Sequence, residues 1–323
     1  MMLLLISSIA IFSIFVYGTV GEIITEKSGH LNLGTPGVMC FGGIGGCLGV
    51  VLASNLVGVD NGFFSGFVII LFSIIFTIIF GGLAGLIYSF LTVTLRANQN
   101  VTGLTLTTFG AAMANFLGSK INRMILVSTS NKFFQRMFPI SDSSNEWLRL
   151  FFSHSFLVYL AIILAILCAV FLKKTKMGLG LRAVGENPAT ADAQGLSVKK
   201  YRYLATICGS VISGFGGLTY IMVQMNGNFE QAVSIEGLGW LAVALVIFSI
   251  WKPTLAIFGS FLFALLYQLP YAGILELSNT SMEFTKMLPY LVTILVLIIT
   301  SILGKKQVLP PQALGTNYFR EDR

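Results

Sequence analysis

The stretch KKTKMGLGLRAVGENPATADAQGLSVKKYRY, from Lys173 to Tyr203, is a polar and basic island between two long apolar runs. It carries two carboxylates, Glu186 and Asp192, and seven of the twenty Lys and Arg residues of the chain. Those seven are Lys173, Lys174, Lys176, Arg182, Lys199, Lys200 and Arg202. Basic residues gather on the cytoplasmic side of membrane proteins. The island therefore predicts a chain that crosses a membrane and exposes this segment to the cytosol.

The composition around the island is that of a helical membrane protein. Of the 323 residues, 55% are hydrophobic and 10% are charged, whereas soluble domains average about 25% charged residues. A span needs roughly 20 apolar residues, and uncharged runs of that kind recur at Leu31–Val59, Asn61–Leu95, Ala97–Ser119, Leu150–Leu172, Tyr203–Phe229, Pro253–Leu275 and Met287–Gly304. These runs do not alternate in hydrophobicity as β-barrel strands do.

We therefore expect an all-α polytopic membrane protein, folded as a single transmembrane domain over residues 1–323. About nine spans fit, within a range of roughly eight to ten. Glycine and Pro36 within Gly34–Val59 allow either close helix packing or a broken or re-entrant helix. Met1–Val20 lacks a basic start and an A-x-A site, which predicts a retained helix rather than a cleaved signal.

The orientation follows by counting spans outward from the cytosolic island. The cytoplasmic segments are then Glu22–His30, Arg96, Lys252 and the polar tail 304–323, and the external ones are the N-terminus, Asp60, Ser119–Arg149, Met225–Glu236 and Tyr271–Glu283. Ser119–Arg149 carries five basic residues, against the charge rule. We expect a cytoplasmic C-terminus.

Several chemistries are disfavoured by the sequence. The chain has no G-x-x-x-x-G-K-[ST], H-E-x-x-H or G-x-S-x-G motif, so we expect neither a nucleotide site nor an enzyme. His30 and His154 are far apart, and the four cysteines lie in apolar runs without a C-x-x-C pair, which predicts no metal site. The net charge of +7 fits lipid headgroups rather than nucleic acid. Sparse carboxylates within the spans argue against an ion-coupled secondary transporter and for an external energy source.

The island itself has the pattern of a small folded element. Gly178 and Gly180 are expected to break the preceding helix. Asn187 can cap a short helix that Pro188 begins and Gly195 ends, and Ser197 can cap the next span. The segment is then either an ordinary re-entry loop or a helix that docks on a separate motor protein.

The island resembles the coupling loop of permease subunits of bacterial ABC importers, in the branch related to ribose-type and branched-chain amino-acid permeases. Within that branch, the chain is similar to the group that carries nucleosides and simple sugars. Four other stretches carry the resemblance in the same order: Glu26–Gly34 (EKSGHLNLG), Thr92–Gln99 (TVTLRANQ), Gly103–Gly110 (GLTLTTFG) and Leu314–Glu321 (LGTNYFRE). Together with the island they cover nearly the whole chain.

The resemblance implies a transmembrane subunit that forms half of a translocation pore in the bacterial plasma membrane. Its partners would be ABC ATPase subunits, a second and different permease, and an extracellular substrate-binding lipoprotein. ATP would be used by those partners, and this chain would bind no cofactor. Coupling to the ATPase would fall on Arg182, Gly185, Glu186, Asn187, Pro188 and Gly195. Nucleosides are the expected substrates, with simple sugars as the alternative and a self-contained secondary transporter as a weaker one.

The substrate path is expected to use uncharged polar residues near helix breaks, with aromatic faces for a ring to stack on. The candidates are Asn32, Thr35, Asn98, Gln99, Phe109, Asn115, Gln224 and Trp240. Each polar candidate has an alternative role, since it can simply hydrogen-bond a neighbouring helix.

One position departs from the family pattern. The family continues "N-I-G-x-E-G", whereas this chain reads Asn32-Leu33-Gly34-Thr35-Pro36-Gly37. Pro36 removes a carboxylate and a backbone donor. Either a different partner permease tolerates the loss, or the substrate differs.

Overall fold

The computed structural model describes residues 2–59, 62–135, 146–271, 284–303 and 310–319. Throughout these ranges the regular structure is helical. The elements are α1 (Met2–Glu26), α2 (Thr35–Val57), α3 (Phe63–Ser89), η1 (Phe90–Thr94), α4 (Gln99–Gly118), α5 (Arg123–Thr129), η2 (Ser130–Phe134), α6 (Glu146–Phe152), α7 (Phe156–Lys174), α8 (Lys176–Glu186), α9 (Pro188–Ala193), α10 (Val198–Thr219), η4 (Tyr220–Gln224), α11 (Val233–Phe248), α12 (Pro253–Gln268), η5 (Leu269–Tyr271) and α14 (Leu288–Leu303).

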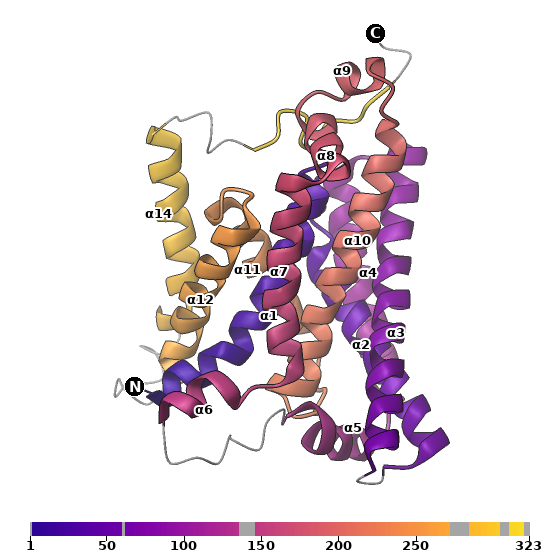
Figure 1. The fold of residues 1–323 in the computed structure, drawn as a ribbon, viewed down its shortest axis with the longest axis vertical. Helices are drawn as coiled ribbons and strands as arrows, with labels where there is room; N and C mark the ends of the chain where they lie inside the picture. The colour runs from indigo at the N-terminus through magenta and orange to yellow at the C-terminus, as the bar shows by residue number, and fades with distance from the viewer. Residues whose placement is uncertain (1, 60–61, 136–145, 272–283, 304–309, 320–323) are drawn as a thin grey trace.

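The helices form a bundle in which α3, α4, α7 and α10 run along one axis and α1 crosses it obliquely (Figure 1). Within the described ranges, six helical segments are long and apolar enough to cross a membrane: Leu4–Glu26, Thr35–Val57, Phe63–Thr94, Phe156–Lys174, Val198–Gln224 and Pro253–Tyr271. Two shorter apolar helices, Val233–Phe248 and Phe284–Val296, lie beside them. The prediction of an all-α polytopic membrane protein is therefore confirmed.

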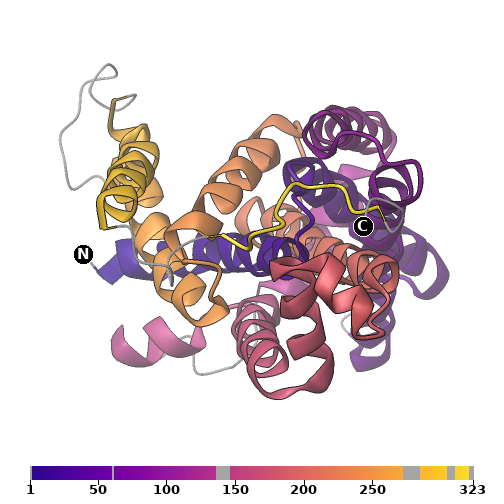
Figure 2. The ribbon, with the colours of Figure 1, turned by 90° about the horizontal axis from the view of Figure 1, so that it is seen from above.

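The short helices mark the two ends of the bundle. Helices α8 and α9 lie at the end where the described chain finishes, and α5 and α6 lie at the opposite end (Figure 1). Seen along the bundle, residues 310–319 run across the α8–α9 end from the side of α14 towards α9 and α10 (Figure 2). This end therefore brings the island together with the last described residues of the chain.

The centre of the bundle is α2, which contacts α3, α4, α10 and α11. Its glycines allow backbone to approach backbone. A Cβ on Gly37 would lie 2.3 Å from the Leu106 carbonyl oxygen of α4, and a Cβ on Gly217 of α10 would lie 1.8 Å from that of Met39. Of the two alternatives for Gly34–Val59, close packing is the one that the structure shows. Pro36 lies in the first turn of a continuous helix, where its missing N–H costs nothing.

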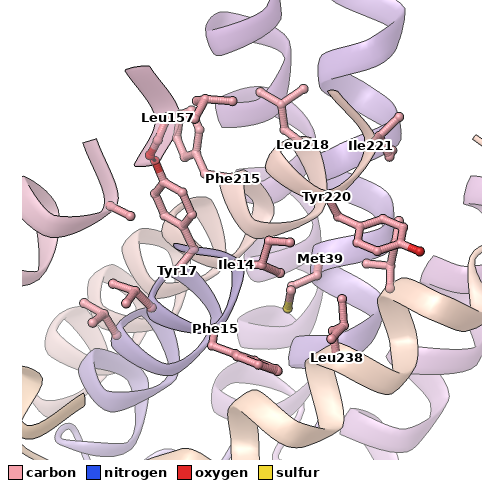
Figure 3. Packing of buried hydrophobic residues seen from close by; sticks show 14 of the residues in the cluster. Ile14, Phe15, Tyr17, Met39, Leu157, Phe215, Leu218, Tyr220, Ile221 and Leu238 are labelled. Atoms are coloured by element: carbon pink, nitrogen blue, oxygen red, sulfur yellow. Dashed lines mark hydrogen bonds between the residues drawn. The ribbon is translucent and has the colours of Figure 1, made fainter. Parts of the chain in front are cut away.

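Side chains fill the space where α1, α2, α10 and α11 meet (Figure 3). Tyr17 is fully buried, stacks on Phe215 with ring centroids 5.8 Å apart, and donates a 2.7 Å hydrogen bond to the Leu157 carbonyl. Ile14, Met39 and Leu218 are buried in the same cluster. Such contacts fix α1 and α7 against the centre of the bundle.

The first helix is longer than expected. The sequence predicts a first helix over Met1–Val20 and a cytoplasmic segment over Glu22–His30, but α1 continues through both Glu22 and Glu26. Their side chains are 1% and 4% exposed, respectively. Polar partners satisfy them there: Glu22 accepts from Thr35 and from the Asn32 N–H, and Glu26 accepts from the Trp251 indole. Buried carboxyl groups are tolerated when they are hydrogen-bonded in this way.

The prediction that Gly178 and Gly180 break a helix is wrong. The break lies at Thr175, which ends α7 and caps α8 by accepting from the Gly178 N–H at 3.0 Å. The two glycines lie inside α8, where space is short. A Cβ on Gly178 would lie 2.1 Å from the Phe171 carbonyl oxygen, and one on Gly180 would lie 2.5 Å from the Tyr201 hydroxyl oxygen.

Other connections differ in detail. The segment Ser119–Arg149 contains α5, η2 and the start of α6 rather than a plain loop. Ser197 precedes α10, but its side chain makes no capping hydrogen bond. Three of the predicted segments lie wholly or partly outside the described residues: Asp60, most of Tyr271–Glu283 and parts of the tail 304–323.

Candidate coupling surface and substrate path

The island folds into two short helices joined at one residue. Asn187 ends α8, and its side-chain oxygen accepts a 3.0 Å hydrogen bond from the Thr190 N–H to cap α9. Pro188 occupies the first position of α9, and Gly195 beyond its end has φ +84°. The expected helix start at Asn187–Pro188 and stop at Gly195 are both present.

Gly185 fixes these helices to the rest of the protein. A Cβ there would lie 2.3 Å from the Lys27 carbonyl oxygen and 3.1 Å from the Gly29 nitrogen. The Gly185 carbonyl also accepts a 3.0 Å hydrogen bond from the Ala313 N–H. The end of α8 therefore lies directly on the connection between α1 and α2, with the tail on its other side.

Residues 313–318, which we name the C-terminal strap, join this end of the bundle. Besides the Ala313 bond, Gly315 N–H donates to the Gly29 carbonyl at 3.3 Å. The Arg202 guanidinium donates to the Thr316 carbonyl at 2.9 Å, and the Tyr318 hydroxyl donates to Asp192 at 2.8 Å. The strap thus touches α8, α9, α10 and the α1–α2 connection together.

A buried polar cluster lies beneath the strap. The Gln99 side chain accepts from the Leu31 N–H at 2.9 Å and donates to the Asn317 side chain at 3.1 Å. His30 is fully buried, with its ring nitrogens 2.7 and 2.8 Å from the Thr206 and Thr92 hydroxyls. Burial, with a smaller contribution from the charge of Arg202, lowers the pKa of His30 to about 3. The ring is therefore neutral at physiological pH.

The coupling candidates differ in exposure. Glu186 and Asn187 are exposed, Arg182 and Pro188 are half-buried, and Gly185 is buried. Burial lowers the pKa of Lys27, and the nearby charge of Glu186 offsets part of that lowering. This corner therefore presents the exposed carboxylate of Glu186 beside the buried Gly185. The coupling roles of the six residues stay predictions.

The substrate-path candidates at this end are occupied by neighbouring backbone. Asn98 caps α4 by accepting from the Val101 N–H at 3.2 Å, and the Asn32 side chain accepts from the Gly34 N–H at 3.0 Å. Thr35 donates to Glu22, and Gln99 binds the strap as described above. The Thr35 and Gln99 contacts correspond to the alternative of hydrogen bonding to a neighbouring element, whereas Asn98 and Asn32 bond within their own local segment. A role in substrate passage stays a prediction for each.

The remaining candidates lie elsewhere. Asn115, near the far end of α4, accepts from the Ala232 N–H at 2.8 Å. Gln224 ends η4 and Trp240 lies in α11, both half-buried. Phe109 is 43% exposed and lines a cavity of about 360 Å³ with α3 and α4 residues. The eight candidates therefore do not surround one cavity within the described residues.

One face of α4 was not recognised in the sequence. Thr105, Thr108, Phe109, Asn115 and Phe116 are all exposed and recur at helical spacing. At 20 residues, α4 is as long as a span, yet it is more polar than the six apolar segments. The regular recurrence of threonine in GLTLTTFG was the available signal. Val101 and Leu104 are exposed on the same helix, so the exposed surface of α4 is mixed in polarity, and its role in a substrate path stays a prediction.

No group of three or more His, Cys, Asp or Glu residues within the described ranges is arranged to hold a metal ion.

Six helices within the described residues that are long and apolar enough to cross a membrane define the class of polytopic α-helical membrane proteins. Residues 4–297 match the family described as "Branched-chain amino acid transport system / permease component", and the chain belongs to that family. It is thus the permease component of a multi-subunit transport system. The expected relationship to ABC importer permeases is confirmed.

Relatives within the family match almost end to end. The chain is 30% identical to the nucleoside ABC transporter permease NupC of Lactococcus lactis, over 98% of this chain and 97% of the relative. It is 31% identical to a putative glucose ABC transporter permease of Haloferax volcanii over 98% of both. It is 28% identical to the guanosine ABC transporter permease of Bacillus subtilis over 94% of this chain and 92% of the relative. No solved structure is significantly similar to the chain.

Proposed function

We propose that this chain forms half of a pore that imports nucleosides. The full-length similarity to two permeases named for nucleosides or guanosine is the observation that carries the substrate class. A nucleoside offers hydroxyl and amide-type groups together with an aromatic base. The binding of such a solute calls for a few polar groups and an aromatic surface.

The exposed face of α4 is our proposed contribution to the path. Thr105 and Thr108 offer hydroxyls, and Phe109 and Phe116 offer rings. The hydroxyls already donate to Val101 and Leu104 of their own helix, at 2.8 and 3.2 Å. Their oxygens can therefore still accept from a passing solute. The opposite wall would come from a second, different permease subunit.

The energy source is proposed to be separate ATPase subunits that dock on the α8–α9 corner. Docking of cytoplasmic ATPases at this end places the α8–α9 corner and the C-terminus in the cytoplasm of a bacterial cell, with the chain in its plasma membrane. An extracellular lipoprotein would deliver substrate at the α5–α6 end. On this proposal the chain binds no cofactor and hydrolyses no ATP. ATPase activity of the purified chain alone would contradict it.

Simple sugars are the second candidate substrate, because the glucose permease relative is as similar as the nucleoside ones. Uptake by cells that express the whole transport system separates the two. We expect labelled guanosine or another nucleoside to accumulate and excess unlabelled nucleoside to block it, with glucose lacking either effect. Accumulation of glucose without nucleoside uptake would replace the nucleoside proposal by the sugar one.

A further inference from the structure

A cavity of about 310 Å³ opens at the α8–α9 end, beside the strap. Its wall comes from η1 and the residues after it, from α9, from the start of α10 and from the strap. Three cationic side chains line it: Arg96, Lys199 and Arg202. Asp192 lines it as well, but that carboxylate accepts the 2.8 Å hydrogen bond from Tyr318. The described lining residues therefore carry a net charge of +2.

Arg202 is the most unusual of these groups. Its side chain is 3% exposed, and only one of its three guanidinium nitrogens has a hydrogen-bond partner, the Thr316 carbonyl. The Nε and Nη2 nitrogens are buried without a partner in the described part of the protein. A buried cationic donor without an acceptor is costly, so a ligand with several acceptor oxygens would satisfy this residue.

The start of α10 adds a second, independent feature. Ser197, Val198 and Lys199 line the cavity, and the Ser197 side chain makes no capping hydrogen bond. The N–H groups of the first turn have no partner within their own helix, and the helix dipole is positive at this end. Lys199 and Lys200 lie in that turn, where the helix dipole disfavours their positive charge.

We propose that this cavity binds a phosphate-type oxyanion. A helix N-terminus with unsatisfied N–H groups, beside a guanidinium with free donors, is the arrangement that recognises phosphate. Two sources share that chemistry: the headgroup of an anionic lipid and free phosphate. Leu95, between the lining residues Thr94 and Arg96, is 59% exposed, so an apolar surface lies beside the cavity. The proposal does not depend on which solute the pore carries.

The test uses the full-length chain in nanodiscs, with the thermal unfolding midpoint as the readout. One arm compares phosphatidylcholine discs with discs that also contain phosphatidylglycerol. The other arm titrates inorganic phosphate into phosphatidylcholine discs, with chloride of equal ionic strength as the reference. A higher unfolding midpoint in the discs with phosphatidylglycerol identifies a lipid headgroup as the ligand. A higher midpoint on addition of inorganic phosphate identifies free phosphate.

Lys199→Gln and Lys200→Gln are matched variants. Both lysines are exposed on the same turn, but only Lys199 lines the cavity. Loss of one charge-assisted contact should weaken binding of the effective ligand about tenfold in Lys199→Gln and leave Lys200→Gln like the parent. The proposal is overturned if neither arm raises the midpoint, or if the two variants weaken binding equally, because the effect would then be general surface charge.

Discussion

Glu186 is the exposed charge at the joint of α8 and α9. Within the described residues its carboxylate accepts one long hydrogen bond, 3.5 Å from the Gln312 nitrogen, so the fold has little need of it. We therefore expect Glu186→Lys to abolish uptake while the protein still reaches the membrane and keeps its thermal midpoint. Uptake by membrane vesicles or cells that carry the whole system measures this.

Glu230→Lys is the matched control, because Glu230 is exposed on the connection between η4 and α11 rather than on the α8–α9 corner. Its uptake should be close to that of the parent. Normal transport by Glu186→Lys would remove the coupling role from this residue.

His30 gives a pH dependence whose sign follows from its surroundings. Its pKa is lowered from the ordinary 6.5 to about 3, so the folded state holds the ring neutral while the unfolded state takes up a proton below pH 6.5. The contribution of His30 to the free energy of unfolding is therefore fully present above pH 6.5 and declines as the pH falls towards 3. Between pH 6.5 and 5 the loss should be about 2 kcal/mol.

The matched variant for this pH effect is His30→Gln, which keeps hydrogen-bonding capacity without a titrating ring. Thermal unfolding of both proteins between pH 7 and 5 should show a steeper decline in the parent. If the two proteins lose stability in parallel, the decline belongs to other groups and not to His30.

At the scale of single elements, α4 is the helix whose exposed face has a proposed function. The double variant Thr105→Val/Thr108→Val keeps side-chain shape and removes two acceptor oxygens. We expect the nucleoside concentration for half-maximal uptake to rise about tenfold, because one or two hydrogen bonds to the substrate are lost. The thermal midpoint should not change.

Leu104→Val on the same exposed face changes packing without polarity and should leave uptake near normal. Equal uptake kinetics in the parent and the double variant would show that the path does not run along α4.

The elements also show what the sequence could predict. Local patterns placed the helix start at Asn187–Pro188 correctly, since capping involves residues three positions apart. Gly178 and Gly180 were misread as breaks because their real constraint is the space left by Phe171 and Tyr201, which no local pattern reveals. The extent of α1 was missed for the same reason, because the partner of Glu26 is Trp251, far along the chain.

The candidate site likewise combines features that local sequence patterns predict with contacts between distant residues that they do not. The coupling candidates lie within one continuous stretch, Arg182–Gly195, and the sequence could group them. Gln99 was proposed for the substrate path, whereas its side chain holds Leu31 and the strap residue Asn317. Its position beside a helix break was read correctly, but the contact 218 residues away lay beyond any sequence pattern.

At the scale of the whole molecule, the strap connects parts that are distant in sequence. Deletion of residues 313–323 would remove the acceptor of buried Arg202 and the bonds to Gly185 and Gly29. Loss of the Arg202 bond alone should cost about 1.5–3 kcal/mol. We expect a lower thermal midpoint, loss of uptake and faster proteolysis within 173–203, while the chain still inserts into the membrane.

Deletion of Glu321–Arg323 alone is the control for that truncation, because it leaves every described strap contact in place. It should behave as the parent does. If the longer deletion resists proteolysis within 173–203 as well as the parent, the strap does not hold the α8–α9 corner.

The strap also orders the biogenesis of the protein. Residues 313–318 are synthesised after every helix that they join, so the ribosome finishes the bundle before Gly185, Gly29 and Arg202 can gain these bonds. Until then these three residues lack the partners that the strap supplies. A chain that stops before residue 313 should therefore expose the α8–α9 corner, which limited proteolysis during synthesis can detect.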